Sequence, residues 1–359
     1  MTRPDPSFWR GKRVLLTGHT GFKGSWAACW LQHLGAEVTG LALAPETTPD
    51  LHTVLGLTYA GETIADIRDA DRTRDAIAAA NPQIVLHMAA QPLVRRSYRD
   101  PLETIGTNVM GTAHVLDALR TVADLEAALV VTSDKAYDNA AYGTQDSPAR
   151  PFVEGDPVGG RDPYSASKGA QELITRSYAQ SFFDKQNVPV ASARAGNVIG
   201  GGDWSEDRLM ADIVRAMAAG EAVHIRNPNA TRPWQHVLEP VAGYLSYAQA
   251  LATGETKDRA LNFGPAGSHP VKTVVTLATD LWPDAPDWIS DAMDGPAEAA
   301  TLELDSSRAA ASIGWQPQLK LEDAVRMTVE WHIAHMKGHN MREVTQTQIE
   351  AYEALLPTR

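Results

Sequence analysis

Short hydrophobic runs of strand length alternate with segments of helical periodicity through the first half of the chain. This alternation is typical of βαβ units, in which a helix returns the chain to the same edge of a parallel sheet after each strand. We therefore expect an α/β fold, with a Rossmann-type, doubly wound parallel sheet over residues 1–197. The predicted strands are 13–18, 36–43, 62–67, 83–90, 127–134 and 188–197, and the clearest predicted helices are 24–35, 111–120 and one that begins near Tyr164.

The pattern changes after residue 197, where short helical segments alternate with loops rich in Gly, Pro and Trp. Such a pattern suits a smaller mixed α/β C-terminal domain that covers the edge of the sheet. Residues 236–251 differ, because they have the periodicity of a long helix that returns to the first domain. We therefore assign 1–197, with a return segment near 236–266, to a Rossmann domain that binds a dinucleotide, and 198–235 with 267–359 to a substrate domain.

Composition narrows the class of protein. Of 359 residues, 43% are hydrophobic and 21% charged, and no apolar run approaches the roughly 18 residues of a membrane span. The formal net charge of −12 argues against a nucleic-acid partner, which favours a basic face. The N-terminus has no apolar signal segment, and the single cysteine, Cys29, cannot form an internal disulfide. These features predict a cytoplasmic enzyme or binding protein that contacts neither membrane nor nucleic acid.

Three glycines stand between the first strand and the first helix, in LTGHTGFKG (residues 16–24). Glycine spacing alone is weak evidence, but this loop directly follows a strand and directly precedes a helix. A tight turn there frees backbone N–H groups at a helix N-terminus, where the helix dipole favours a pyrophosphate. A glycine turn without a ligand is the alternative. We expect a dinucleotide to contact Gly18, Gly21, Phe22, Lys23 and Gly24.

The identity of the dinucleotide depends on the residue that meets the adenosine ribose. An acid at the end of the second strand selects NAD, whereas a base selects the 2′-phosphate of NADP. No Lys or Arg occurs from 38 to 67, and the acid Glu46 comes somewhat late. The pattern favours NAD, with Lys23 as a phosphate clamp and with Asp66 and Ile67, at the end of the third strand, beside the adenine.

Two opposite charges stand where a hydrophobic strand ends, in VVTSDKAYD (residues 130–138). Asp134 and Lys135 are either the solvated end of that strand or they face a pocket at the carboxyl edge of the sheet, where open α/β folds bind ligands. A second segment, DPYSASKG, places Tyr164 and Lys168 four residues apart and therefore on one face of a helix. A lone Tyr-xxx-Lys pair is common by chance, so its meaning depends on these neighbours.

Taken together, the glycine loop, the TSD segment and the Tyr-xxx-Lys pair resemble the extended short-chain dehydrogenase/reductase family. The resemblance implies that Ser133, Tyr164 and Lys168 form a catalytic set. Tyr164 would be the general base, with the pKa of its phenol lowered from about 10 by the Lys168 ammonium and a positive nicotinamide. Lys168 would also bind the nicotinamide ribose, and Ser133 would hydrogen-bond the reacting oxygen.

Further segments extend the resemblance. HMAAQ (residues 87–91) is similar to the family's loop over the cofactor phosphates, and TNVMGT is similar to a helix start that carries an asparagine. RAGNVIGGGDW and ATRPWQHV are similar to loops that hold a sugar diphosphate, for which a planar guanidinium is well suited. The resemblance thus implies cofactor contacts by His87, Ala89, Ala90 and Asn108, and substrate contacts by Gln91, Asn197, Arg208, Arg232 and His236.

The resemblance covers nearly the whole chain and is strongest to the CDP-glucose 4,6-dehydratases of that family, through strings such as TSDKAYDN and RNPNATRPWQHVLEP. Those enzymes oxidise the hexose C4 hydroxyl, remove water across C5 and C6, and reduce C6 with the same bound NAD, in deoxysugar and O-antigen biosynthesis. By resemblance, Asp134 protonates the departing hydroxyl, and Lys135 is either the C5 base or a cation that stabilises the enolate. Arg161 stands where an aromatic residue is usual, which leaves the identity of the substrate open.

Other interpretations remain open at this stage. The same fold serves nucleotide-sugar 4-epimerases and dehydratases for other nucleotides, and an inactive cofactor sensor would keep the fold without the Ser-Tyr-Lys set. His332, His335 and His339 have metal-like spacing, but without a nearby carboxylate pair or cysteine we expect no metal and a solvated or interface helix. The resemblance also implies a homodimer or a dimer of dimers, through two helices of each chain.

Overall fold

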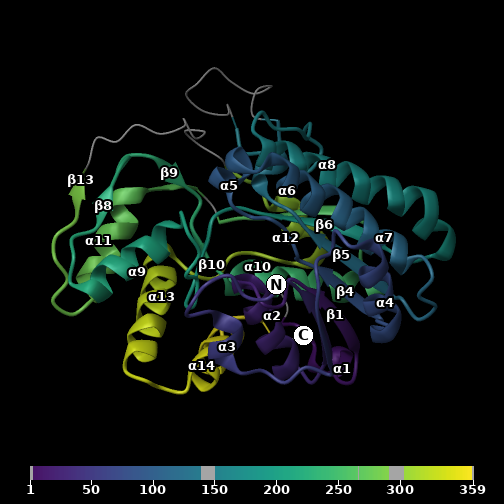
Figure 1. Ribbon diagram of the computed structural model, residues 1–359, viewed down its shortest axis with the longest axis horizontal. Coiled ribbons are helices and arrows are strands. Elements are labelled where there is room, and N and C mark those ends of the chain that lie inside the picture. The colour runs from purple at the N-terminus through teal and green to yellow at the C-terminus, as the bar shows by residue number, and fades with distance from the viewer. Residues whose placement is uncertain (1–2, 139–149, 266, 291–302, 358–359) are drawn as a thin grey trace.

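A parallel sheet of seven strands organises the larger part of the molecule (Figure 1). The computed structural model describes residues 3–138, 150–265, 267–290 and 303–357. The strand order is β11-β6-β5-β4-β1-β2-β3, so the chain winds outward from β1 to one edge and then crosses to β4 and the other edge. This order confirms the predicted doubly wound fold. The strands are β1 (Arg13–Thr17), β2 (Glu37–Ala42), β3 (Gly61–Ile64), β4 (Ile84–His87), β5 (Ala127–Val131), β6 (Val190–Ala195) and β11 (Ala260–Phe263).

The central strands are buried on both faces, which explains why their sequences are almost continuously apolar. Every residue of β4, β5 and β6 is buried. By contrast, β3 lies at an edge and alternates between half-buried and exposed residues. It also ends earlier than the sequence indicated, at Ile64, because Asp66 and Ile67 already belong to the turn that leads into the next helix.

Helices cover both faces of the sheet (Figure 1). On one face α4, α7 and α8 share an apolar core with the strands; on the other face α2 and α10 do so, and α14 packs outside α2. Within the described residues, no helix combines the length and the apolar character that crossing a membrane requires. The helices of this part are α1 (Pro6–Trp9), α2 (Phe22–His33), α3 (Leu51–Leu55), α4 (Ala70–Ala80), α5 (Val94–Arg99), α6 (Pro101–Ile105), the π-helix η1 (Gly106–Gly111), α7 (Thr112–Leu119), the 3-10 helix η2 (Asp134–Ala136), α8 (Pro163–Tyr178), η3 (Ala179–Phe183), η4 (Asp184–Gln186), α10 (Leu238–Ala252), α12 (Ser307–Ile313) and α14 (Met341–Glu353).

A smaller body with its own apolar core lies beside the carboxyl edge of the sheet (Figure 1). The predicted return segment belongs to the sheet layer, because α10 packs against β4 and β5 while β11 pairs with β6. The division of the chain into two domains stays a prediction. The smaller body contains α9 (Leu209–Ala219), α11 (Val271–Leu281), α13 (Leu321–Met336) and the short pairs β7 (Val198–Ile199) with β10 (Gln235–His236), β8 (His224–Ile225) with β13 (Ile289–Ser290), and β9 (Thr231–Arg232) with β12 (His269–Pro270).

Helix α14 closes the core around α2. Glu353, at the end of α14, is buried and accepts a hydrogen bond from Trp30 Nε1 of α2 at 2.7 Å. Arg3 pairs with the same carboxylate, and its backbone N–H donates to the Pro357 carbonyl at 3.2 Å. Residues near the two ends of the chain therefore lie side by side (Figure 1).

Candidate active site

The glycine loop is shaped so that only glycine fits at two of its positions. Gly18 has φ of +76°, and a Cβ there would lie 2.7 Å from the Ala89 backbone nitrogen. A Cβ on Gly24 would lie 2.0 Å from the Gly18 carbonyl oxygen. The loop is thereby held against the turn that follows β4. Helix α2 begins after Gly21 without a side-chain cap, so the N–H groups of its first turn are available to an anion.

Buried hydrogen bonds hold the strand end of β4. His87 is fully buried, with Nδ1 2.7 Å from Thr17 Oγ1 and Nε2 2.9 Å from Thr112 Oγ1. Burial, together with the nearby Lys168 charge, lowers the pKa of His87 to about 3. The imidazole is therefore neutral at physiological pH and acts as a rigid bridge between β1, β4 and α7.

The next residues are fixed by Asn108 and Gln91. Asn108 Oδ1 accepts from the Gln91 N–H at 2.8 Å, and Asn108 Nδ2 donates to Ser167 Oγ at 2.9 Å. The Gln91 side chain donates to the Leu93 carbonyl and to Thr104 Oγ1, and accepts from the Leu93 N–H at 2.6 Å. Both amide groups are thus engaged within the protein, where they shape the loop that the sequence assigned to cofactor and substrate.

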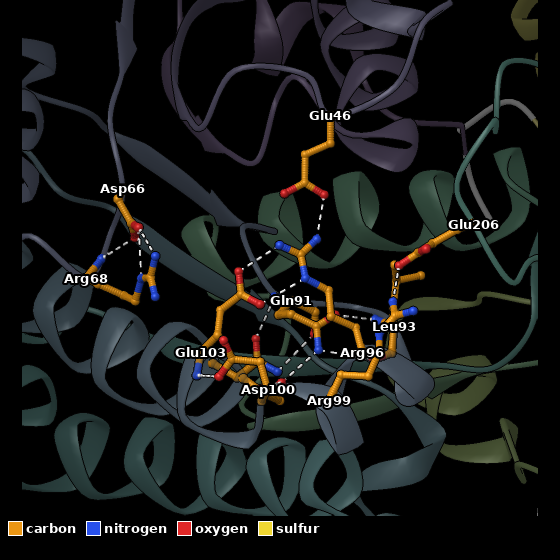
Figure 2. Close-up of polar contacts among 12 residues, drawn as sticks. Glu46, Asp66, Arg68, Gln91, Leu93, Arg96, Arg99, Asp100, Glu103 and Glu206 are labelled. Atoms are coloured by element: carbon orange, nitrogen blue, oxygen red, sulfur yellow. Dashed lines mark hydrogen bonds and ion pairs between the residues drawn. The ribbon is translucent and has the colours of Figure 1, made fainter. Parts of the chain in front are cut away.

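Ion pairs from α5 tie down the surrounding loops. Figure 2 shows Arg96 between Glu46, from the loop after β2, and Glu103 of α6, with Nη–Oε distances of 2.7 Å to each. Arg99 pairs in the same way with Glu206, from the loop before α9. Exposed pairs of this kind contribute little stability individually. Their effect is geometric, because one short helix connects a loop beside β2 with a loop of the smaller body.

Ser133 and Asp134 lie at the carboxyl end of β5. Ser133 Oγ accepts from the Lys135 N–H at 3.2 Å, which begins η2, and donates to Asp134 Oδ1 at 2.9 Å. Asp134 is 2% exposed, and its Oδ2 has no hydrogen-bond partner among the described residues. Lys135 is half-buried. The carboxylate is therefore an inward-facing group with an unused oxygen, which is not what the solvated end of a strand looks like.

Tyr164 and Lys168 lie in the first turns of α8, and both side chains are buried. The Tyr164 hydroxyl hydrogen-bonds Ser133, and Lys168 Nζ donates to Gln171 Oε1 at 2.9 Å. Burial raises the pKa of Tyr164, although the Arg208 charge and the Ser133 hydrogen bond oppose this. The direction is opposite to the one expected from sequence, because desolvation outweighs the nearby positive charge in the protein without its ligands.

Two lysines at the centre of the site are held in a poorly solvated environment. Burial and the Lys23 charge lower the pKa of Lys168 to about 7, although the Glu172 carboxylate opposes this. Burial and the Arg208 charge lower the pKa of Lys23 to about 8, against the effect of Asp134. Placing two lysine ammonium groups here therefore costs solvation free energy. An anionic ligand would offset that cost, so the site favours one.

A buried ion pair supports the carboxyl end of β5 from behind. Glu172 of α8 accepts from Arg194 Nε at 2.9 Å and from Arg194 Nη2 at 2.7 Å, and both side chains are 6% exposed. Glu172 also accepts from Thr132 Oγ1 at 2.5 Å, the residue just before Ser133. Glu172 and Arg194 were not among the site residues predicted from the sequence. A signal was present, because Arg194 interrupts an otherwise apolar strand and Glu172 follows Lys168 by one helical turn.

Tyr244 is a second residue that the sequence analysis missed. It lies in α10, is 1% exposed, and its hydroxyl has no hydrogen-bond partner among the described residues. Its ring centroid is 5.9 Å from Lys23 Nζ, and the charge of Asp134 contributes to raising its pKa. No pattern distinguished it, since it stands among the apolar residues of a core helix.

The loops predicted to hold a sugar diphosphate come together beside Asp134. The β7–β10 pair joins the two loops, and the Gln235 N–H donates to the Asn197 carbonyl at 3.0 Å. A Cβ on Gly196 would lie 3.2 Å from Asp134 Oδ2, and the Asn197 Oδ1 atom is buried without a partner among the described residues. Arg232, in the adjoining strand β9, is 7% exposed.

Arg208 and His236 complete the set of predicted substrate residues. Arg208 precedes α9 and donates to the Pro92 carbonyl at 3.0 Å, and its charge acts on both Tyr164 and Lys23. His236 is fully buried, edge-on to Trp26 with ring centroids 5.8 Å apart, and burial lowers its pKa to about 3. Arg208 thus lies at the site, whereas His236 lies behind it in the core.

The remaining predicted residues lie farther from this centre. Asp66 accepts from the Arg68 N–H at 2.8 Å and pairs with the Arg68 guanidinium (Figure 2). Ile67 is buried in the turn beside it. Of the three histidines in the predicted interface helix, His335 stacks on Trp331 with ring planes 7° apart, and His332 packs edge-on to Trp204.

A doubly wound sheet with a glycine loop after β1, and with Ser, Tyr and Lys gathered at its carboxyl edge, defines an extended short-chain dehydrogenase/reductase. The model for the family described as GDP-mannose 4,6 dehydratase matches residues 15–328. The chain is 45% identical to the CDP-glucose 4,6-dehydratase of Salmonella typhimurium, over 97% of this chain and 98% of that protein. It is 26% identical to dTDP-glucose 4,6-dehydratase 1 of Escherichia coli, over 90% and 94%. The chain therefore belongs to this family of nucleotide-sugar 4,6-dehydratases.

Solved structures agree on the fold. The UDP-glucose 4-epimerase of Thermotoga maritima, with UDP-glucose, superposes with a TM-score of 0.78 at 22% identity, covering 90% of this chain and 99% of that one. The UDP-glucuronic acid 4-epimerase of Bacillus cereus, in complex with UDP-glucuronic acid and NAD, has a TM-score of 0.73 at 20% identity, with the same coverage. At this level of identity the likeness concerns the arrangement of the elements alone.

Proposed function

We propose that this chain is a CDP-glucose 4,6-dehydratase that converts CDP-glucose to CDP-4-keto-6-deoxyglucose and water with one bound NAD. The observation that carries the proposal is the buried Asp134 beside Ser133 and Tyr164, with one carboxylate oxygen unused. A 4-epimerase needs a proton acceptor at C4 only. A dehydratase also needs an acid for the C6 hydroxyl, and Asp134 is in a position to supply it.

The chain fits NAD at the glycine loop. Gly18 and Gly24 leave room for close backbone approach, the first turn of α2 is uncapped, and Lys23 carries positive charge beside it. NAD supplies a hydride acceptor for C4 and later a hydride donor for C6, together with a positive nicotinamide that offsets the effect of burial on the Tyr164 pKa. Asp66 and Ile67 are proposed to border the adenine, and His87, Ala89, Ala90 and Asn108 to shape the wall of this site.

Tyr164 and Ser133 handle the first proton. In the proposal, the phenolate of Tyr164 takes the C4 hydroxyl proton as the hydride leaves C4, and Ser133 holds the reacting oxygen. Lys168 orients the nicotinamide ribose, and its buried charge stabilises the phenolate. The interaction of the Tyr164 hydroxyl with Ser133 supports this pairing.

Asp134 and Lys135 handle the elimination. Oxidation at C4 makes the C5 proton acidic, so that a base can remove it while Asp134 gives a proton to the C6 hydroxyl and water departs. Lys135 is proposed as the group that acts at C5, either as the base or as a cation beside the enolate. Their adjacency in η2 supports this proposal, because the acid and the amine would act on neighbouring carbons.

The positive residues of the substrate loops are proposed to bind the CDP moiety. Arg232 pairs with the diphosphate, Asn197 uses its buried, unpartnered oxygen and its amide, and Arg208 adds charge. The hydrogen bonds of Gln91 favour a role in shaping the loop, and the burial of His236 favours a role behind the site. Arg161, which stands where an aromatic residue is usual, is proposed to affect which sugar is accepted.

An apolar surface supports the expected homodimer or dimer of dimers. Monomeric soluble proteins seldom expose a large contiguous apolar patch, and such patches mark association surfaces. Here α5, α6, η1 and α8 contact one another. They expose large hydrophobic side chains, namely Tyr98, Leu102, Ile105, Met110 and Leu173. We further propose that the product enters a deoxysugar pathway in the cytoplasm, such as the one that supplies O-antigen.

Mass spectrometry with a panel of sugar nucleotides tests the proposal. CDP-, dTDP-, UDP- and GDP-glucose are each incubated with the enzyme and NAD and scored for loss of water. We expect CDP-glucose to react fastest, and deuterium placed at C4 to appear at C6 without release of free reduced cofactor. Isomerisation without water loss would instead identify a 4-epimerase.

An Asp134→Asn variant tests the role of the acid. The amide keeps the shape but cannot readily donate a proton, so oxidation should proceed and elimination should stall. Rapid mixing should show reduced-nicotinamide absorbance that builds with little product. Lys257→Met, a change at an exposed residue, serves as the control. An Asp134→Asn enzyme that turns over normally would remove the acid from the mechanism.

A further inference from the structure

A cluster of metal-ligating side chains lies on the far side of the glycine loop from the catalytic set. His19 comes from the loop itself, His52 from α3 and Glu62 from β3. Glu62 Oε1 is 2.7 Å from His19 Nε2 and 3.4 Å from His52 Nε2, and the three ligand atoms all lie within 4.8 Å of one another. Three separate elements therefore direct donors to one point.

The donor set and its spacing match zinc chemistry. Two imidazoles and one carboxylate are a common zinc set, with bonds of about 2.0–2.1 Å to nitrogen and a fourth position left for water. Ligand atoms around a tetrahedral ion at that bond length are about 3.3–3.4 Å apart. The His52–Glu62 separation, 3.4 Å, already has this value, and His19 and Glu62, 2.7 Å apart, must separate by about 0.6–0.7 Å to reach it.

The burial and the exposure of the cluster also suit a metal. His19 is fully buried, so its ring is held in place behind the other two ligands. The Glu62 and His52 side chains are 36% and 19% exposed, which gives an ion a path from solvent. Tyr59 stacks on His52 and packs edge-on to His19, and so limits the motion of both rings.

We propose that His19, His52 and Glu62 form a site for a divalent cation of the zinc class, with a fourth position open to water. An ion there would fasten the glycine loop to β3 and α3, since His19 stands directly after Gly18. The sequence did not indicate this site, because the other two ligands lie 33 or more positions after His19 in the chain. The more conspicuous histidines of α13 pack on tryptophans instead. The site is independent of the proposed dehydratase activity.

Equilibrium dialysis tests the site directly. Protein stripped with a chelator is dialysed against Zn²⁺, and Co²⁺ is used as a spectroscopic probe of coordination. We expect one ion per chain, a visible Co²⁺ spectrum of four-coordinate intensity, and an unfolding temperature that rises with Zn²⁺. His52→Ala and Glu62→Gln should each abolish tight binding and the Zn²⁺-dependent rise.

Two controls keep the outcome decisive. His335→Ala, in α13, and His339→Ala, in the loop after α13, alter histidines outside the cluster and should bind as the unaltered chain does; loss of binding in either would place the ion at that end of α13 and overturn the proposal. Glu62→Gln nearly preserves the shape of the side chain, and its circular dichroism spectrum reports whether it folds. Absence of stoichiometric binding by the unaltered chain, or retention of it in folded His52→Ala and Glu62→Gln, would show that the three residues form only a hydrogen-bonded cluster.

Discussion

Replacing Lys168 with methionine should make the protein more stable although it removes a group proposed to act in catalysis. Lys168 is 3% exposed, and burial, with the Lys23 charge, lowers its pKa from 10.5 to about 7. A lysine whose pKa is lowered in the folded state destabilises the fold. The destabilisation is largest below that lowered pKa, where the lysine is protonated in both the folded and the unfolded state. The penalty is relieved as the pH rises from about 7 toward 10.5, because only the unfolded chain still holds the proton.

The expected size follows from these two pKa values. Each pKa unit corresponds to about 1.4 kcal/mol, so the buried ammonium lowers the free energy of unfolding by about 5 kcal/mol at pH 6 and by roughly 1 kcal/mol at pH 9.5. The substitution also removes the donor to Gln171 Oε1, which costs about 1–2 kcal/mol. The net stabilisation by Lys168→Met should therefore be about 3 kcal/mol at pH 6 and near zero at pH 9.5.

Urea unfolding at the two pH values measures this difference. Lys257→Met, at an exposed position, is the matched control and should change the free energy of unfolding little at either pH. The reasoning is refuted if Lys168→Met is no more stable than the unaltered protein at pH 6, or if the gain is the same at pH 9.5. A positive result would identify the site as a place where the chain sacrifices stability for function.

Three further substitutions test other parts of the site. Tyr164→Phe should lower turnover by several orders of magnitude while NAD binding persists, and near-normal turnover would exclude Tyr164 as the base. Arg232→Ala should raise KM more than it lowers kcat, because a diphosphate contact is made equally in ground and transition states; a fall in kcat alone would place Arg232 at the sugar. Arg194→Met leaves Glu172 buried without its partner and should cost about 3–5 kcal/mol in urea unfolding, whereas a loss below about 1 kcal/mol would contradict a desolvated pair.

Sequence patterns predicted the fold well because the sheet is built from local signals. Apolar strands, helix periodicity and turn glycines each act over a few residues, and all point to the same doubly wound topology. The central strands β4, β5 and β6 lie within the predicted ranges. The strand ends were predicted less well: β3, β4 and β5 each end three residues before the predicted ranges do, and at the edge strand β3 the weak apolar pattern made Asp66 resemble its continuation.

The site was predictable only where its residues form compact motifs. Ser133, Tyr164 and Lys168 stand in recognisable strings, and in the structure Tyr164 meets Ser133 at the end of β5. Interactions between distant segments carried no such signal: Tyr244 approaches Lys23 from a core helix, and Glu172 meets Arg194 across the sheet. The pKa of Tyr164 could not be predicted either, since burial depends on the complete packing of the site.

The position of α14 has a consequence for how the protein is made. Ile349 and Tyr352 of this helix belong to the same apolar core as Trp30 of α2, and Glu353 binds the Trp30 indole. A chain emerging from the ribosome thus forms the early strands while one wall of their core is still to be synthesised. Domains generally fold from the N-terminus as they are translated, but here the core around α2 is complete only when α14 has been released. A truncation that removes α14 would consequently damage the part of the chain that is synthesised first.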